Sequence, residues 1–145
     1  MSPISDGEGG SDARGLSTAL ALSGDTSCIA RARHHAADFL ARVRVERKIP
    51  VSARAVGLTQ LVVSELVTNA RVHAPGPALM ELRITDTTVE VSVQDSIPDP
   101  PAAHPADPRR VGRHGLEIVQ AIAHSFRIRL GPTGKRVSAR IALTD

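Results

Sequence analysis

Residues 63–74 read VSELVTNARVHA, and this stretch decides the fold. It lies inside a longer segment, residues 53–73, whose apolar side chains cover most of a helical circumference. A helix that is apolar nearly all round is usually buried in a core. Ser52 can cap this helix, and the Pro-Gly-Pro run at 75–77 ends it. The sequence therefore predicts a buried helix over residues 53–73.

Three polar residues interrupt this apolar helix. Glu65, Asn69 and His73 are spaced four residues apart, so they form one stripe on the helix surface. An Asn and a Glu one turn apart can hold a hydrated Mg²⁺ through the amide oxygen while the carboxylate orients a nucleophile. Two alternatives stay open: the stripe faces solvent, or its groups cap neighbouring backbone. For His73 a structural role is expected.

Hydrophobic periodicity outlines the other elements. We expect an edge strand at 16–22, an amphipathic helix at 26–47, a hairpin with strands at 78–85 and 89–95, a third helix at about 112–125 and a closing hairpin with strands at 126–130 and 137–143. Each strand of the first hairpin should have one buried and one wet face. This order predicts an α+β two-layer sandwich, in which three helices cover one face of an open, mostly antiparallel sheet of about five strands.

Two segments lack periodicity. Residues 1–14 are rich in Gly, Ser and Asp and are expected to form a disordered tail, which leaves 15–145 as one domain. The proline-rich stretch Ser96–Arg110 is expected to be a long loop, and such loops in compact domains often serve as functional lids.

A second candidate site residue ends the strand at 89–95. Asp95 continues the phase of Val89, Val91 and Val93, so its carboxylate should point toward the core. An acceptor there suits the amino group of an adenine. The alternative is an Asp that merely starts the following turn.

The third candidate is the stretch GRHGL at residues 112–116. A glycine-rich turn that opens a helix presents free backbone N–H groups and the positive end of the helix dipole to phosphates. Arg109, Arg110 and Arg113 add positive charge nearby. The stretch fits neither the P-loop nor the dinucleotide fingerprint, and an ordinary helix start remains the alternative.

Taken in this order, the three motifs resemble the histidine-kinase-like ATPase fold, also called the Bergerat ATP-binding fold. Within it, the chain looks like the small stand-alone ATP-binding proteins of the anti-sigma-factor serine/threonine kinase group. The resemblance covers residues 16–143 and is strongest over 63–74.

The resemblance implies a role for each motif. Asn69 would coordinate the Mg²⁺ that bridges the ATP phosphates, Glu65 would be the general base, and Asp95 would bind the adenine amino group. The loop at 96–110 would be the ATP lid. Further ATP-binding residues would come from the glycine-rich turn: Gly112, Arg113, His114, Gly115 and Leu116.

The chain departs from the family pattern around the adenine pocket. Ile97 stands where the family often has Gly, Arg136 follows the Gly-Lys pair where Thr is usual, and Ser138 replaces an aromatic residue. These changes favour the alternative of a non-catalytic module that binds its partner with or without nucleotide. Retention of Glu65 favours the enzyme, because a pure binder needs no base there.

Composition and resemblance together define the expected partners. The only aromatic residues are two Phe, so the stacking platforms of a single-strand nucleic-acid binder are missing, and no direct nucleic-acid partner is expected. No apolar run reaches the roughly 20 residues of a membrane helix, and no signal peptide is visible. The single cysteine, Cys28, excludes an intrachain disulfide. We expect a cytoplasmic protein, and the resemblance implies a homodimer that binds an anti-sigma antagonist and a sigma factor.

Five arginines fall on the polar phase of the predicted strands, together with Glu81 and Glu90. The expected consequence is a solvated face whose charges are balanced, and the alternative is a dock for an acidic partner. The arginines are Arg83, Arg127, Arg129, Arg136 and Arg140.

Overall fold

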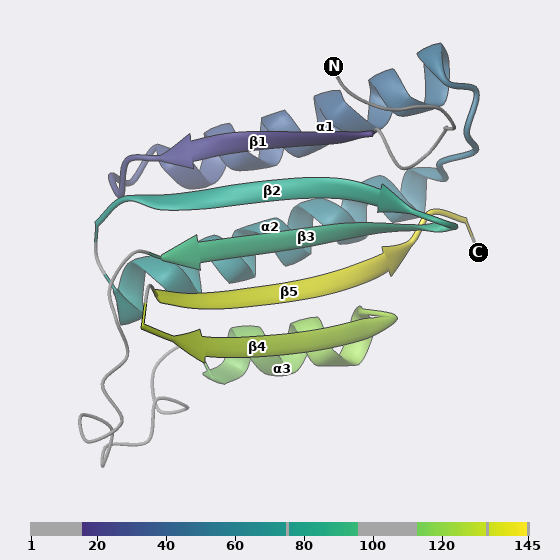
Figure 1. Cartoon of the computed structure of the whole chain (residues 1–145). Coiled ribbons are helices and arrows are strands. Elements are labelled where there is room, and N and C mark those ends of the chain that lie inside the picture. The colour runs from purple at the N-terminus through teal and green to yellow at the C-terminus, as the bar shows by residue number, and fades with distance from the viewer. Residues whose placement is uncertain (1–15, 75, 96–112, 133, 145) are drawn as a thin grey trace.

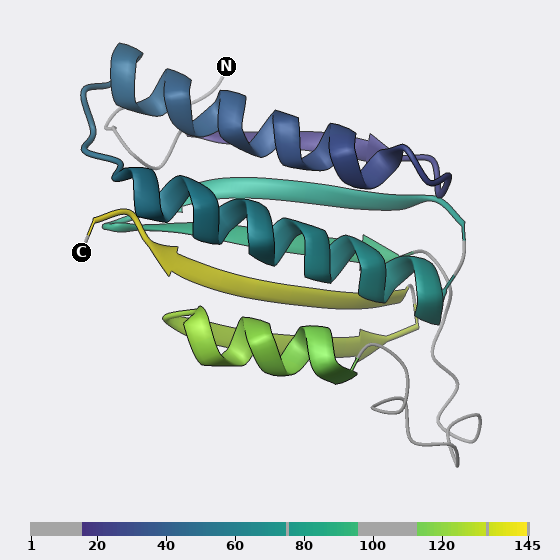
Figure 2. The same cartoon turned by 180° about the vertical axis from the view of Figure 1, so that it is seen from behind.

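In the part of the chain that the structure describes, five strands form one sheet and three helices lie against one of its faces (Figures 1 and 2). The computed structural model describes residues 16–74, 76–95, 113–132 and 134–144, so the tail at 1–14 and the loop at 96–110 lie outside it. The elements in chain order are β1 (Ser17–Leu22), α1 (Cys28–Glu46), α2 (Ala53–His73), β2 (Ala78–Thr85), β3 (Thr88–Asp95), α3 (Arg113–Ile122), β4 (Ser125–Gly131) and β5 (Gly134–Ala142).

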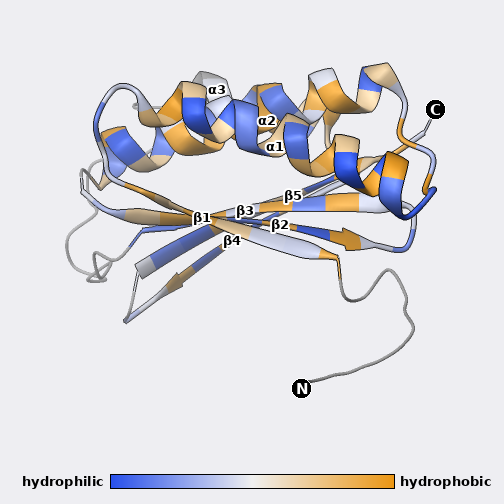
Figure 3. Ribbon diagram, turned by 90° about the horizontal axis from the view of Figure 1, so that it is seen from above, coloured by the Kyte–Doolittle hydropathy of each residue, from blue (hydrophilic) through white to orange (hydrophobic). Residues whose placement is uncertain are grey.

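The sheet has the order β1-β2-β3-β5-β4, and each of these neighbouring pairs is antiparallel. Consequently β3 is the central strand, while β1 and β4 are the edges. Seen along the layers, the helices all lie on one side of the sheet (Figure 3). This arrangement confirms the predicted α+β two-layer sandwich with an open antiparallel sheet.

The core lies between α2 and the middle of the sheet. Val63, Leu66 and Val67 of α2 are buried against strand residues such as Val91 and Val93. Helix α2 has the predicted bounds, and Ser52 caps it: its side chain accepts a hydrogen bond from the Ala55 N–H at 3.0 Å. The predicted buried helix is confirmed, and of its polar stripe Asn69 is buried while Glu65 and His73 are half-buried.

Two helix boundaries differ from the prediction. Helix α1 begins at Cys28, because the Asp25 carboxylate accepts the Ser27 N–H at 3.0 Å and holds the preceding residues in a turn. Helix α3 ends at Ile122, because Ser125 already pairs with Arg140 in the sheet. The helix therefore ends earlier than its apolar pattern predicts, because the following residues pair in the sheet.

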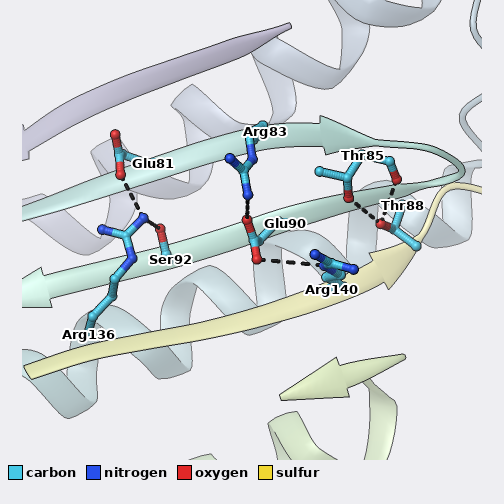
Figure 4. A network of polar contacts seen from close by, with 8 residues as sticks. All are labelled: Glu81, Arg83, Thr85, Thr88, Glu90, Ser92, Arg136 and Arg140. Atoms are coloured by element: carbon cyan, nitrogen blue, oxygen red, sulfur yellow. Dashed lines mark hydrogen bonds and ion pairs between the residues drawn. The ribbon is translucent and has the colours of Figure 1, made fainter. Parts of the chain in front are cut away.

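The central strand β3 also differs, because both of its faces are largely covered. Ser92, expected on a wet face, is buried, and so is Thr88, which was expected in the hairpin turn. The Arg136 guanidinium lies over Ser92 and donates to its hydroxyl at 2.9 Å (Figure 4). Thr88 pairs with Thr85 across the hairpin, so it belongs to the strand and not to the turn.

The face of the sheet opposite the helices, the outer face, carries a network of ion pairs (Figure 4). Arg136 pairs with Glu81 at 2.8 Å, and Glu90 pairs with Arg83 at 2.6 Å and with Arg140 at 3.6 Å. Partly exposed pairs of this kind each contribute about 0–1 kcal/mol. The expected balance of charge is confirmed at these residues.

Candidate functional site

Four elements meet at one end of the sheet, the left end in Figure 1. Helix α2 and strand β3 end there, while helix α3 and strand β5 begin there. Because β3 and β5 are hydrogen-bonded neighbours, the last residues of one lie beside the first residues of the other. This end brings together Asn69 near the end of α2, Asp95 at the end of β3 and Gly115 near the start of α3.

Asp95 is the last residue of β3 and is only 2% exposed. Its Oδ1 accepts the backbone N–H of Lys135 at 3.0 Å. The residue before that lysine is Gly134, with φ of 136°, and a Cβ there would collide with the backbone carbonyl of Asp95. Glycine is therefore required at this contact, and the inward direction predicted for the Asp95 carboxylate is confirmed.

Asn69 is buried on the inner side of α2, with 4% of its surface exposed. Its Oδ1 accepts a hydrogen bond from Lys135 Nζ at 3.1 Å. The alternative of a solvent-facing stripe is therefore wrong for Asn69. A buried polar oxygen at this place needs a donor or a cation, and the structure supplies an ammonium group.

Glu65 lies one turn before Asn69 and is half-buried. Its Oε1 lies so close to Gly115 that a Cβ on residue 115 would collide with it. The structure thus joins two motifs that are 50 residues apart in the chain (115 minus 65). The glycine in the first turn of α3 leaves room for a carboxylate from α2.

The remaining predicted residues are placed less completely. Leu116 is half-buried and packs against the core, and His73 is the half-buried last residue of α2. Arg113 begins α3, but its side chain and that of His114 lie outside the described part of the structure. The same holds for the whole of the following residues: Ile97, Arg109, Arg110 and Gly112.

Lys135 is the functional candidate that the sequence reasoning missed. Its backbone N–H binds Asp95, its ammonium group binds Asn69, and only 7% of the residue is exposed. A signal was present in the sequence. Lys135 shares the inward phase of Val137 and Ala139 on the last strand, where a lysine is unusual.

The Arg136 side chain lies on the outer face of the sheet. Its guanidinium contacts Glu81, Ser92 and Gln94 on the outer face, the last at 3.1 Å. The expectation that Arg136 alters the pocket beside Asp95 is therefore wrong, because alternation along β5 turns its side chain to the other face. The unusual side chain beside Asp95 and Asn69 is that of Lys135.

The side chains of Asn69 and Asp95 at this end of the sheet have the chemical groups that can bind a magnesium ion and a nucleotide base. Asn69 Oδ1 already accepts from a cationic group, and a side-chain amide oxygen is a normal ligand for a hard divalent cation. No three His, Cys, Asp or Glu side chains of the described residues gather to hold a metal. A metal ion at this end would have the Asn69 amide oxygen as a ligand. The Asp95 carboxylate accepts an N–H, as an adenine-binding group must.

None of the described helices combines the length and the apolar character that crossing a membrane requires.

A similar solved structure is the histidine kinase domain from Erythrobacter litoralis EL346 blue-light activated histidine kinase, with 24% identity and a TM-score of 0.40. The alignment covers 61% of this chain and 45% of that chain, so it spans less than half of the solved domain. No curated protein matches the chain.

The family profile described as histidine kinase-like ATPase domain matches residues 24–141. This range contains the polar stripe of α2, the end of β3 and the start of α3. Membership implies ATP as the ligand. The chain belongs to the histidine kinase-like ATPase domain family.

Proposed function

We propose that this protein binds Mg·ATP and transfers the γ-phosphoryl group to a serine or threonine of a small antagonist protein. One observation carries the proposal: Asp95, Asn69 and Glu65, drawn from a strand and a helix, lie at the same end of the sheet as the first turn of α3. Phosphoryl transfer depends mainly on positioning and on stabilising charge. These residues supply groups for both tasks.

Base recognition falls to Asp95. Its carboxylate is buried and accepts N–H groups, so it can accept the exocyclic amino group of adenine. Guanine has a carbonyl oxygen at the corresponding ring position, and two facing acceptors repel each other. Asp95 therefore favours ATP over GTP.

The metal ion would be held by Asn69 through Oδ1. When bound, it would neutralise the charge that develops on the phosphate oxygens. Asn69 is well suited to position such an ion, because burial among core residues of α2 fixes its side chain. The preceding turn of the same helix carries Glu65, about 6 Å away along the axis.

Glu65 would act as the general base. Its carboxylate accepts the proton of the attacking hydroxyl while the hydroxyl oxygen bonds to the γ-phosphorus. The bond between that phosphorus and the β–γ bridging oxygen breaks, and ADP leaves. The contact with Gly115 fixes how near α3 approaches this carboxylate.

The proposed partners rest on the resemblance of residues 63–74, 95 and 112–116 to anti-sigma-factor kinases. By this proposal the protein is a homodimer that phosphorylates an anti-sigma antagonist and, in an alternative complex, sequesters a sigma factor.

A second candidate function is a non-catalytic module that binds its partner with or without nucleotide. The Lys135–Asn69 hydrogen bond favours it, because the oxygen proposed for magnesium is already engaged by a cation. Under this alternative Glu65 has no chemical task.

The two functions are separated by Glu65→Gln, a nearly isosteric change that removes the base. The matched control is Glu46→Gln, at the exposed end of α1. We expect wild type and control to transfer label from γ-labelled ATP to a serine or threonine of a small protein in a cell extract. Transfer by Glu65→Gln should be at least about 100-fold slower, with ATP affinity retained. Equal transfer by Glu65→Gln would contradict the assigned base, and ATP-independent partner binding without transfer would support the second function.

A further inference from the structure

Lys135 is a lysine in a core position. It is the second residue of β5, and its neighbours in the same phase, Val137 and Ala139, are buried. Lysine is almost never fully buried unless its ammonium group is paired. Here Nζ reaches Asn69 Oδ1 at 3.1 Å. The long side chain therefore ends on the one amide that the proposed function assigns to magnesium.

The same lysine also contacts the group proposed for adenine. Its backbone N–H donates to Asp95 Oδ1 at 3.0 Å, so Lys135 bridges Asp95 and Asn69. A ligand that uses both of these side chains must meet the lysine between them. Lys135 consequently belongs to the binding site and is not only a structural contact.

An ammonium group and a divalent metal ion both bind the lone pairs of an amide oxygen. Two cations on one oxygen repel each other, and the repulsion is strong where water is excluded. Asn69 is 4% exposed and Lys135 is 7% exposed, so little water screens this pair. The two cations therefore exclude each other at Asn69.

We propose that Lys135 is a resident cation of this site, which holds the Asn69 amide oxygen in the nucleotide-free protein and competes there with the divalent metal ion. The inference rests on the proposed function, since it concerns how the same site binds Mg·ATP. The lysine stem is flexible, so the displaced ammonium group can turn toward the phosphate oxygens.

This role predicts an unusual dependence on magnesium. Without the metal, the Lys135 ammonium group supplies positive charge to the phosphates. With the metal, the lysine must first be displaced from Asn69. Both effects reduce the advantage of Mg·ATP over metal-free ATP. The ratio of the dissociation constant measured in EDTA to that measured in magnesium should therefore be small for the wild type.

The test is calorimetric titration of ATP, with magnesium and with EDTA, into wild type and Lys135→Gln. Glutamine keeps an N–H donor for Asn69 but removes the charge. The control is Lys48→Gln, an exposed residue in the connection between α1 and α2. This connection lies at the opposite end of the sheet (Figure 2). We expect the ratio to rise about tenfold in Lys135→Gln and to stay unchanged in the control. A partly unfolded fraction cancels in this ratio.

A second measurement needs no nucleotide. Lys48 and Lys135 are the only lysines of the chain, so an amine-acetylating reagent and mass spectrometry report each one separately. In the folded protein Lys135 should react at least about tenfold more slowly than Lys48, and the two should react alike in denaturant. Equal acetylation rates of Lys48 and Lys135 in the folded protein would contradict the burial of the Lys135 ammonium group and overturn the inference.

The outcomes separate this inference from the function on which it rests. If wild type and Lys135→Gln both bind ATP and have the same ratio of the dissociation constant in EDTA to that in magnesium, the inference is overturned and the nucleotide site stands. If only Lys135→Gln binds Mg·ATP, the competition is supported in its strongest form. If neither binds ATP, the proposed function fails and the inference fails with it.

Discussion

Gly115 in the first turn of α3 lies against the carboxylate of Glu65 in α2, so closely that a Cβ on residue 115 would collide with Oε1. The obstructing atom is the end of a flexible side chain and not backbone, so the carboxylate can move aside. Moving it changes the position of the proposed general base. A substitution at Gly115 should therefore change the activity without lowering the stability of the fold.

Gly115→Ala should lower phosphoryl transfer by at least about tenfold. It should leave the free energy of unfolding unchanged or raise it by about 0.5–1 kcal/mol, because alanine is the better helix former. Denaturant unfolding and a transfer assay on the same preparation measure both effects. A large loss of stability with unchanged transfer would mean that Gly115 serves helix packing alone.

Asp95→Asn tests base recognition. The variant keeps Oδ1 as an acceptor for the Lys135 N–H, so the fold should be retained. It loses the charged acceptor for the adenine amino group, and a hydrogen bond to a charged group contributes about 1.5–3 kcal/mol. ATP affinity should therefore fall roughly 10- to 100-fold, and the preference for ATP over GTP should shrink. An unchanged preference in competition binding would place the base elsewhere.

Arg136→Thr tests which residue after Gly134 matters to the nucleotide. The Arg136 side chain contacts Glu81, Ser92 and Gln94 on the outer face. We expect the free energy of unfolding to fall by about 1 kcal/mol and ATP affinity to stay within about twofold. Lys135→Gln is the matched comparison, because it changes the adjacent residue on the inner face. A strong effect of Arg136→Thr on ATP affinity would contradict the placement of this side chain.

The pH dependence of stability should include a contribution from His35 in α1. Burial lowers the pKa of His35 below its usual 6.5, and nearby Arg42 lowers it further while Asp38 opposes the shift. Its Nε2 lies 3.0 Å from Thr18 Oγ1. Because the folded protein holds this proton more weakly than the unfolded chain, the contribution is present above pH 6.5 and is lost as the pH falls below it.

His35→Gln should remove this dependence. We expect the wild type to lose more stability than His35→Gln between pH 7.5 and pH 5.5 in urea unfolding. Exposed His34 on the same helix offers the control His34→Gln, which should follow the wild type. Identical pH profiles for the wild type and His35→Gln would contradict the lowered pKa.

Much of the fold was predictable because single helices and hairpins carry their own periodicity. The bounds of α2 and β2 matched the prediction, since Ser52 caps one and a two-residue turn ends the other. The predicted end of α3 was wrong because the pairing of Ser125 with Arg140, which ends the helix earlier, is a tertiary contact. The burial of Ser92 was missed for a similar reason, since an arginine from β5 covers it.

The candidate site was predictable where each motif carries its own signal, as for the polar stripe of α2 and the inward phase of Asp95. The contact of Glu65 with Gly115 was not predictable, because it depends on how two helices approach each other. Lys135 was overlooked beside Arg136, which differs from the family pattern. Alternation along the strand places Lys135 in the same inward phase as Val137 and Ala139, and this pattern alone predicts an inward lysine.

The central claim is that Mg·ATP binds at Asn69. Calorimetric titration of Mg·ATP into wild type, Asn69→Ala and the control Gln60→Ala tests it most directly. Gln60 is another amide on α2, but it donates to the Arg33 carbonyl in α1, away from the site. The account predicts saturable binding to wild type and control, and at least about tenfold weaker binding to a folded Asn69→Ala. Equal binding to all three, or no binding to the wild type, would contradict it.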